Sequence, residues 1–183
     1  MAASLEHTVL PAPEFDKPVK VLIVVSPYYS EIAAGLLEGA QAALEGAGAS
    51  FEVVQMPGAL EIPTAIGISD RQNNFDGYVA LGCVIRGETT HYETVCNDSS
   101  RALTLLGLQG LCIGNGILTV ETVAQAQVRS NPAGQNKGAG AALAALHLIA
   151  LARKGSHSSK GIGFMPQGDD TLMAGDMVPP RAR

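Results

Sequence analysis

"LGCVIRGETTHYETVC", residues 81–96, is the stretch that decides the fold prediction. An apolar run stops at Gly87, and two threonines and His91 follow within four residues. An apolar run closed by a glycine and followed by polar residues is typical of a strand that leads into a helix. Open parallel sheets bind ligands at the carboxyl ends of their strands. The stretch therefore predicts a strand, a helix and a binding site between them.

Three more short apolar runs alternate along the chain with segments of helical spacing. The four runs are "VKVLIVVS" (19–26), "FEVVQM" (51–56), "GYVALGCVI" (77–85) and "LCIGNGI" (111–117). The predicted helices are 30–46, 58–72, 89–107, one capped by Thr119 with Glu121 in its first turn, and one from about Lys137 to Lys154. Strands that alternate with helices form βαβ units. The predicted fold class is α/β: a three-layer α/β/α domain with a four-stranded parallel sheet covered on both faces.

Length and composition exclude several classes of protein. The 183 residues suit one domain, which we expect at 18–154, with a flexible segment at 1–17 and a disordered tail at 155–183. The net charge of -5 does not favour nucleic-acid binding, which needs a basic surface. No signal peptide and no membrane-spanning segment is recognised, and three cysteines without CxxC spacing suit a reducing cytoplasm.

The last predicted helix carries the stretch "AGAALAALHLIALA" (139–152), which is apolar around most of its circumference. Packing against the sheet is one explanation of this pattern. Burial between subunits is the other, and we favour it because one chain of this size would struggle to cover the whole helix. The pattern therefore predicts a homo-oligomer.

The junction at 84–91 has the features of an anion site. Backbone N–H groups at a helix start lack intrahelical partners, and the helix dipole favours an anion there. Gly87 permits close approach of a phosphate, and the hydroxyls of Thr89 and Thr90 can donate to it. Histidine titrates near neutral pH, so His91 in the first turn suits proton transfer. A threonine N-cap beside a surface histidine explains the same residues, and the pattern leaves both interpretations open.

Further candidate residues lie elsewhere along the chain. Arg129 and Lys137 flank a short turn at Asn131–Pro132, although solvated surface charge is the usual explanation for such a pair. A tyrosine after the first strand, Tyr28 or Tyr29, suits stacking on a flat heterocycle. No Walker A sequence, GxGxxG or metal-ligand spacing occurs, so we predict neither a metal nor a cofactor.

Five segments in this order resemble the 6,7-dimethyl-8-ribityllumazine synthase family across residues 19–153: "PGALEIP", "LGCVIRGETTHYE", "GNGILTVET", "QAQVR" and "NKGAGAA". The resemblance implies flavodoxin-like winding of the sheet. It also implies a transferase that condenses 5-amino-6-(D-ribitylamino)uracil with 3,4-dihydroxy-2-butanone 4-phosphate in riboflavin biosynthesis. Phosphate and water are released, and no cofactor or metal is needed. The sites would lie between subunits of a pentamer or of a multiple of it.

The resemblance also implies a role for individual residues. His91 would shuttle protons, while the side chain of Arg86 would point away from the phosphate and be structural. The phosphate substrate would be bound by Gly87, Glu88, Thr89, Arg129 and Lys137. The ribitylaminouracil would be bound by Tyr28, Ala59, Leu60, Glu61, Cys83, Val84, Ile85 and Asn115.

Two alternatives stay open at this point. Pro27-Tyr28-Tyr29 stands where many family members have Arg, Phe and Asn, which keeps a catalytically weak flavin- or lumazine-binding or shell-forming member of the same fold as one alternative. A transferase that uses another phosphate substrate on a wound sheet is the second.

Overall fold

The computed structural model describes residues 10–158 with the exception of residue 73. The elements are β1 (Lys20–Val25), α1 (Ser30–Gly46), β2 (Ser50–Gln55), α2 (Glu61–Asp70), β3 (Gly77–Ile85), α3 (His91–Leu108), β4 (Ile113–Val120), α4 (Val123–Ser130) and α5 (Lys137–Ser158). All strand pairs are parallel, and the strand order is β2-β1-β3-β4. The predicted fold class, a three-layer α/β/α domain with flavodoxin-like winding, is confirmed.

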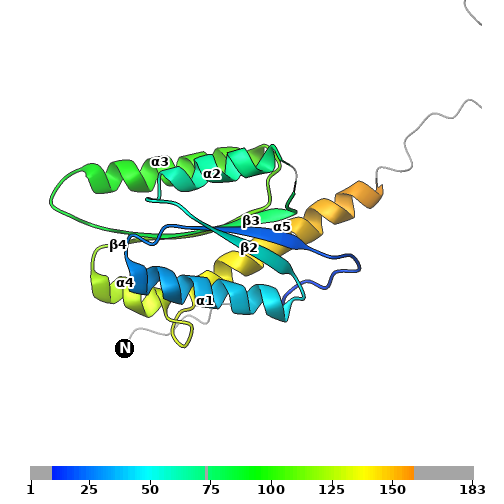
Figure 1. Ribbon diagram of the computed structural model, residues 1–183, viewed down its shortest axis with the longest axis horizontal. Helices are drawn as coiled ribbons and strands as arrows, with labels where there is room; N and C mark the ends of the chain where they lie inside the picture. Colours follow the sequence, from blue (N-terminus) through cyan, green and yellow to red (C-terminus); the bar gives the residue numbers. More distant parts are fainter. Residues whose placement is uncertain (1–9, 73, 159–183) are drawn as a thin grey trace, which may run out of the picture.

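The two faces of the sheet carry separate sets of helices, as Figure 1 shows: α2 and α3 cover one face, and α1, α4 and α5 lie on the other. Strand β1 contributes to both cores. Val21, Ile23 and Val25 pack in the cluster shared with α1 and α5, whereas Leu22 and Val24 pack in the cluster shared with α2 and α3. Successive side chains of a strand point to opposite faces, so a strand buried on both sides has to be apolar throughout.

Two glycines allow close approach of α5 to the rest of the domain. A Cβ atom on Gly114 of β4 would lie 1.8 Å from the carbonyl oxygen of Ala141, and one on Gly138 would lie 2.0 Å from the carbonyl oxygen of Leu36. Any side chain at these positions would separate the backbones that now pack together. The glycines of "GNG" and "NKG" therefore set how closely α5 packs against β4 and α1.

The predicted start of the fourth helix was wrong. Thr119 does not cap a helix but lies in β4, opposite Val84 of β3. Pairing with β3 continues to Val120, so α4 starts later, with Thr122 as its N-cap, whose hydroxyl oxygen accepts the backbone N–H of Gln125 at 3.3 Å. The threonine that caps the helix is thus the second one of the "LTVET" stretch.

Strand β2 departs from the prediction of a sheet covered on both faces. It lies at one edge of the sheet, and its residues are exposed with the exception of the half-buried Phe51. Val53 and Val54 are 38% and 37% exposed. The helices of one chain bury the central strands but leave this edge strand open.

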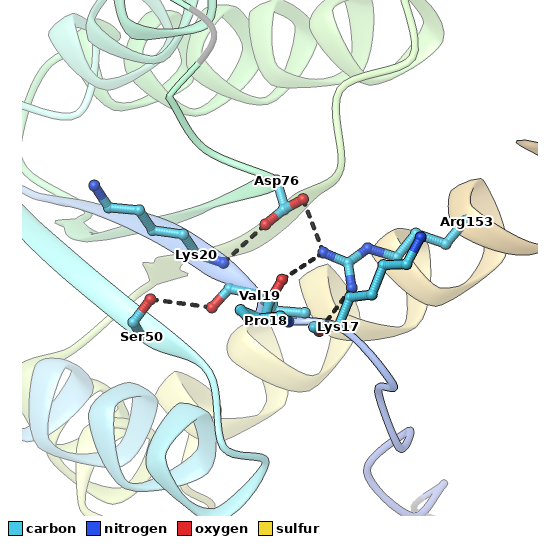
Figure 2. A network of polar contacts seen from close by, with 7 residues as sticks. All are labelled: Lys17, Pro18, Val19, Lys20, Ser50, Asp76 and Arg153. Carbon is cyan, nitrogen blue, oxygen red and sulfur yellow. Dashed lines mark hydrogen bonds and ion pairs between the residues drawn. The ribbon is translucent and has the colours of Figure 1, made fainter.

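The two ends of the predicted domain meet at the amino end of the sheet, shown in Figure 2. Arg153 of α5 forms an ion pair with Asp76 at 3.0 Å and donates to the carbonyl oxygens of Lys17 and Pro18. Asp76 also accepts the backbone N–H of Lys20 at 2.8 Å. Arg153 thus ties the last helix to the start of the first strand.

Helix α5 continues beyond the predicted Lys154 to Ser158. Residues 1–9 and 159–183, which make up most of the segments predicted to be flexible, lie outside the described residues. No helix among the described residues is both long and apolar enough to cross a membrane.

Tyr78 of β3 gives the fold a measurable dependence on alkaline pH. Its ring is 2% exposed, and its hydroxyl donates to Asp70 Oδ1 at 3.3 Å. Burial, and then the neighbouring Asp70 carboxylate, raise the pKa of Tyr78 to about 12. An unfolded tyrosine titrates near about 10, so the unfolded chain loses this proton first. The contribution is complete below about pH 10 and is lost as pH rises towards about 12.

We therefore expect the urea midpoint of the wild type to fall between about pH 10 and 12, and Tyr78→Phe to show a smaller fall. Other groups titrate in this range, so the difference between the two proteins is the quantity to measure. Tyr28→Phe is the matched control, since that ring is 73% exposed. Identical pH slopes for the wild type and Tyr78→Phe would contradict the assignment.

Candidate active site

A cavity of about 460 Å³ lies at the carboxyl end of the sheet. Its walls come from the segments that follow β1, β2 and β3, so it is located where strand order reverses between β1 and β3. That switch point is where doubly wound sheets bind ligands. The lining residues are Ser26, Tyr28, Tyr29, Gly58, Ala59, Leu60, Glu61, Cys83, Val84, Ile85, Gly87, Thr89, His91, Tyr92 and Val95.

The segment after β1 supplies an aromatic pair. Tyr28 and Tyr29 pack edge to face, with ring centroids 5.0 Å apart. Tyr28 is 73% exposed, whereas Tyr29 is half-buried. Burial, followed by its neighbours Tyr28 and Cys83, raises the pKa of Tyr29, so this phenol stays protonated. The exposed ring of Tyr28 is available to stack on a flat ligand.

The segment after β2 forms a turn before α2 begins at Glu61, three residues later than the sequence predicted. The hydroxyl of Ser26 donates to the carbonyl oxygen of Pro57 at 3.3 Å and ties this turn to the end of β1. A Cβ on Gly58 would lie 2.8 Å from Glu61 Oε2, so the carboxylate of Glu61 lies close over Gly58. The turn thus places one carboxylate and several backbone groups at the cavity.

The junction between β3 and α3 carries His91 as the first residue of the helix. Thr90 occupies the N-cap position without a side-chain capping hydrogen bond, and His91 is exposed. Thr89 Oγ1 accepts the His91 N–H at the long distance of 3.4 Å. Gly87, Thr89 and His91 line the cavity, whereas Glu88 of the same loop does not. The helix start is thus open towards the cavity, as an anion site requires.

A second cavity, also of about 460 Å³, lies between β4, the end of α4 and the start of α5. Of the predicted site residues, it contains Asn115, Arg129 and Lys137. Arg129 lies in the last turn of α4, where its Nη1 donates to the carbonyl oxygen of Gln125 at 3.1 Å. Asn136 adopts a φ of 46° and accepts the Ala139 N–H, which fixes the start of α5 at Lys137. Among the described residues, no carboxylate forms an ion pair with Arg129 or Lys137.

The structure therefore separates the predicted site residues into two groups. The first cavity is lined by most residues predicted to bind the ribitylaminouracil, together with Gly87, Thr89 and His91. Asn115 and the two predicted cations, Arg129 and Lys137, line the second. None of the described residues that line the first cavity is a lysine or an arginine. In one chain, the loop expected to hold a phosphate thus faces no cation in its own cavity.

The sequence analysis missed several lining residues, among them Ser26, Tyr92 and Val95. Val95 follows His91 by one helical turn, so the i, i+4 spacing could have found it. Tyr29 was considered together with Tyr28, and the structure places both at the cavity. Ser26 and Tyr92 have no local signal, because their positions depend on the turn after β2 and on the packing of Arg86.

Cysteine chemistry does not fit the first cavity. All three cysteines are unpaired, and burial raises the pKa of the Cys83 thiol to about 11. A thiol with that pKa stays protonated near neutral pH, where a nucleophile would need the thiolate. In the part of the chain that the structure describes, no three His, Cys, Asp or Glu side chains gather as a metal site would require.

The fold and the first cavity define a class of protein: a doubly wound α/β protein with a cavity at the switch point of its parallel sheet, where this class binds ligands. Comparison with known protein families identifies the family within this class. The sequence model described as 6,7-dimethyl-8-ribityllumazine synthase matches residues 18–153, and the chain belongs to this family.

Curated relatives agree with the match. Proteins named 6,7-dimethyl-8-ribityllumazine synthase from Jannaschia sp. (strain CCS1) and from Novosphingobium aromaticivorans are 57% identical over 156 residues and 51% identical over 137 residues. These alignments cover 85% and 75% of this chain and 88% and 99% of the relatives' chains. A protein of the same name from Bartonella tribocorum is 52% identical over 143 residues, covering 77% of this chain and 95% of its own. The predicted family is confirmed, and with it the predicted function as a transferase of riboflavin biosynthesis.

Proposed function

We propose that this chain condenses 5-amino-6-(D-ribitylamino)uracil with 3,4-dihydroxy-2-butanone 4-phosphate at a site that two copies of the chain share. The proposal of a shared site is supported by one observation: His91 lines one cavity, whereas Arg129 and Lys137 line another. A phosphate at the start of α3 carries negative charge that a guanidinium would neutralise through paired hydrogen bonds. A neighbouring copy that presents its second cavity would supply that cation.

The residues of the first cavity suit the two substrates. The ring of Tyr28 stacks on the uracil, and Ala59, Leu60 and Glu61 contact the ribityl chain and ring. Backbone groups of Cys83, Val84 and Ile85 pair with the pyrimidine edge. Gly87 and Thr89 hold the phosphate through backbone N–H groups, and Glu88 takes part through its backbone alone, because its side chain lies outside the cavity.

His91 moves the protons of the reaction. The 5-amino nitrogen attacks the ketone carbonyl and forms a C–N bond, and the carbonyl oxygen leaves as water once it is protonated. Loss of the C3 proton and of phosphate gives an enol, which tautomerises to a ketone. The ribitylamino nitrogen attacks this ketone, and the ring closes to the lumazine as its oxygen leaves as a second water. Each step transfers a proton at an atom near the start of α3, within reach of one imidazole. Holding the two substrates together contributes up to roughly 7–11 kcal/mol of the barrier reduction.

Exposed apolar side chains support an oligomer. Leu105 and Leu108 of α3 and Leu151 of α5 are 54%, 81% and 67% exposed in the single chain. Apolar surface of this kind is typical of contacts between subunits. We propose a homo-oligomer, a pentamer or a multiple of it, whose contacts cover part of this surface and bring the two cavities of adjacent copies together.

Mixing two impaired variants tests the shared site, with turnover assayed at a concentration of the phosphate substrate well below the KM of Arg129→Ala. His91→Asn damages the first cavity, and Arg129→Ala damages the second. When the two proteins are unfolded together at equal concentrations and reassembled, about one quarter of the sites should combine two intact halves, if subunits mix at random. We therefore expect turnover of about a quarter of that of wild type reassembled in the same way, well above either variant alone.

The matched control mixes His91→Asn with Tyr28→Ala. Both changes lie in the first cavity, so no combination of these chains restores an intact site, and turnover should stay at the mean of the two variants. Equal turnover in both mixtures would overturn the shared site while leaving the activity itself intact. A wild type that binds a flavin but makes no lumazine would instead contradict the activity.

We further propose that the enzyme domain spans 18–154 and that the protein works in the cytoplasm. The three unpaired cysteines support a reducing compartment.

A further inference from the structure

The side chain of Arg86 joins three segments at the carboxyl end of the sheet. Its Nη1 forms an ion pair with Glu93 of α3, and its Nε forms one with Glu121 Oε2 at 2.6 Å, in the link between β4 and α4. Its guanidinium carbon lies 4.1 Å from the ring centroid of Tyr92. Its backbone N–H donates to the carbonyl oxygen of Val120 at 2.9 Å. Both the side chain and the backbone of Arg86 are thus held in place, directly before the loop 87–90 that is proposed to bind the phosphate.

Two of these contacts involve the residues that directly follow His91. Successive residues of an α-helix are about 100° apart, so the side chain of Glu93 leaves the helix about 200° away from that of His91. Tyr92 lines the first cavity and packs against the guanidinium. Arg86 therefore holds the first turn of α3 from the side opposite to His91. A rotation of this turn that moves the imidazole also moves Glu93 relative to Arg86, so the ion pair opposes it.

This turn has little other support. Thr90 makes no side-chain capping hydrogen bond, and the hydrogen bond from the His91 N–H to Thr89 is 3.4 Å long. Helix starts are usually fixed by a capping side chain that accepts a backbone N–H. Arg86 supplies the missing constraint through Glu93 and Tyr92.

The third contact reaches the helix that carries Arg129. Glu121 directly precedes Thr122, the N-cap of α4, and its backbone N–H donates to Gln125 Oε1 at 2.9 Å. The carbonyl oxygen of the same Gln125 accepts Arg129 Nη1. Arg86 therefore connects the turn of His91 with the start of the helix that holds Arg129 one turn further along.

We propose that Arg86 is a positioning residue, which fixes the imidazole of His91 through Glu93 and Tyr92 and the start of the Arg129 helix through Glu121. Its side chain lines neither cavity, so it acts through other residues and is not catalytic. The inference rests on the proposed function, because it assigns a purpose to the position of His91. If Arg86 had a purely structural role, its replacement would change stability only slightly and leave kcat unchanged, because exposed ion pairs contribute little to stability.

The variants Arg86→Met and Arg86→Lys test the proposal. A shift of a reacting group by about 1 Å can cost on the order of 10²-fold, so we expect Arg86→Met to lower kcat by about 10- to 10²-fold. The KM for the ribitylaminouracil should stay within about threefold, because the side-chain partners of Arg86, namely Glu93, Glu121 and Tyr92, are not assigned to this substrate. Arg86→Lys should fail to restore kcat, since one ammonium cannot hold two carboxylates and a ring as the planar guanidinium does.

Substitutions at Glu93 and at Glu121 distinguish the effects of the two ion pairs of Arg86. Glu93→Gln should reproduce the loss of kcat, because it releases the turn of His91. Glu121→Gln should act mainly on the KM for the phosphate substrate, because it releases the start of the Arg129 helix. Combining Arg86→Met with Glu93→Gln should add little to either change alone, as expected for two residues of one interaction.

Arg153→Met is the matched control, because Arg153 forms an ion pair with Asp76 at the opposite end of the sheet (Figure 2). Like Arg86, it also has an aromatic contact, to Phe15 at 5.5 Å. It should lower the Tm while kcat and both KM values per folded oligomer stay unchanged. Loss of kcat in Arg153→Met to the same extent as in Arg86→Met would overturn the proposal, and so would an unchanged kcat in Arg86→Met.

Hydrogen exchange gives a readout that does not depend on turnover. Amides of 87–93 should exchange faster in Arg86→Met than in the wild type, and at the wild-type rate in Arg153→Met. Unchanged exchange of 87–93 in Arg86→Met would overturn the positioning role. Absence of lumazine formation by the wild type would contradict the proposed function alone, because the exchange experiment still tests Arg86.

Discussion

Replacing His91 by asparagine is expected to lower kcat by about 10²-fold, within the usual contribution of one positioned acid–base group. The start of α3 presents the imidazole of His91 to the first cavity, and a histidine side chain can transfer protons near neutral pH. Asparagine keeps a polar group of similar size but neither accepts nor releases a proton near neutral pH. Residual turnover should remain, since binding both substrates side by side supplies much of the acceleration.

The measurement is steady-state formation of the lumazine chromophore between pH 5 and 9. In the wild type, kcat should follow an ionisation that is absent from the profile of His91→Asn, and both KM values should stay within about threefold. His147→Asn is the control, because His147 on α5 lines neither cavity. A kcat of His91→Asn within about twofold of the wild type would exclude His91 as the acid–base group.

Replacing Arg129 by alanine is expected to raise the KM for 3,4-dihydroxy-2-butanone 4-phosphate by about 10- to 10²-fold. Hydrogen bonds to charged groups contribute about 1.5–3 kcal/mol, which corresponds to this range. The half-buried guanidinium lies in the second cavity, where Gln125 holds it by one hydrogen bond. Its remaining donors suit a phosphate brought by an adjacent copy.

Three comparisons make the Arg129 prediction specific. The KM for the ribitylaminouracil should change by less than about threefold, because Arg129 is assigned to the other substrate. Arg129→Lys should recover part of the loss, since it keeps the charge but not the planar fork. Arg101→Ala on α3 removes an exposed arginine that lines neither cavity and should leave both KM values unchanged. Unchanged kinetics in Arg129→Ala would show that another group neutralises the phosphate.

Local pattern was sufficient to predict the order of the elements and the placement of His91. Residues 21–25, "VLIVV", are apolar at every position because neighbours such as Leu22 and Ile23 enter different cores, so adjacent residues carry this requirement. His91 lies a few residues after the end of β3 and Gly87, so its place at a helix start is also a local property. The start of α4 was misplaced because two threonines fit the capping pattern, and only the length of the β3–β4 pairing selects Thr122.

Residue types and the resemblance suggested most of the site, but not its division between two cavities. Arg129 and Lys137 were grouped with Gly87, Glu88 and Thr89, whereas the structure places the two cations beside β4 and α5. No spacing along the chain encodes this separation, because it depends on how α5 crosses β4 at Gly114. The same limit applies to Glu88, whose side chain direction depends on the path of the loop.

The sequence by itself determined the alternation of strands and helices, the parallel sheet and the family, because these depend on periodicity and on short motifs within single segments. Tertiary structure decided which edge strand stays exposed, which cavity each cation enters and what holds the turn of His91. Arg86 meets Glu93 and Glu121 across 7 and 35 positions of the sequence. Contacts of that kind form only when separate elements pack in one geometry, and the strand order β2-β1-β3-β4 sets that geometry.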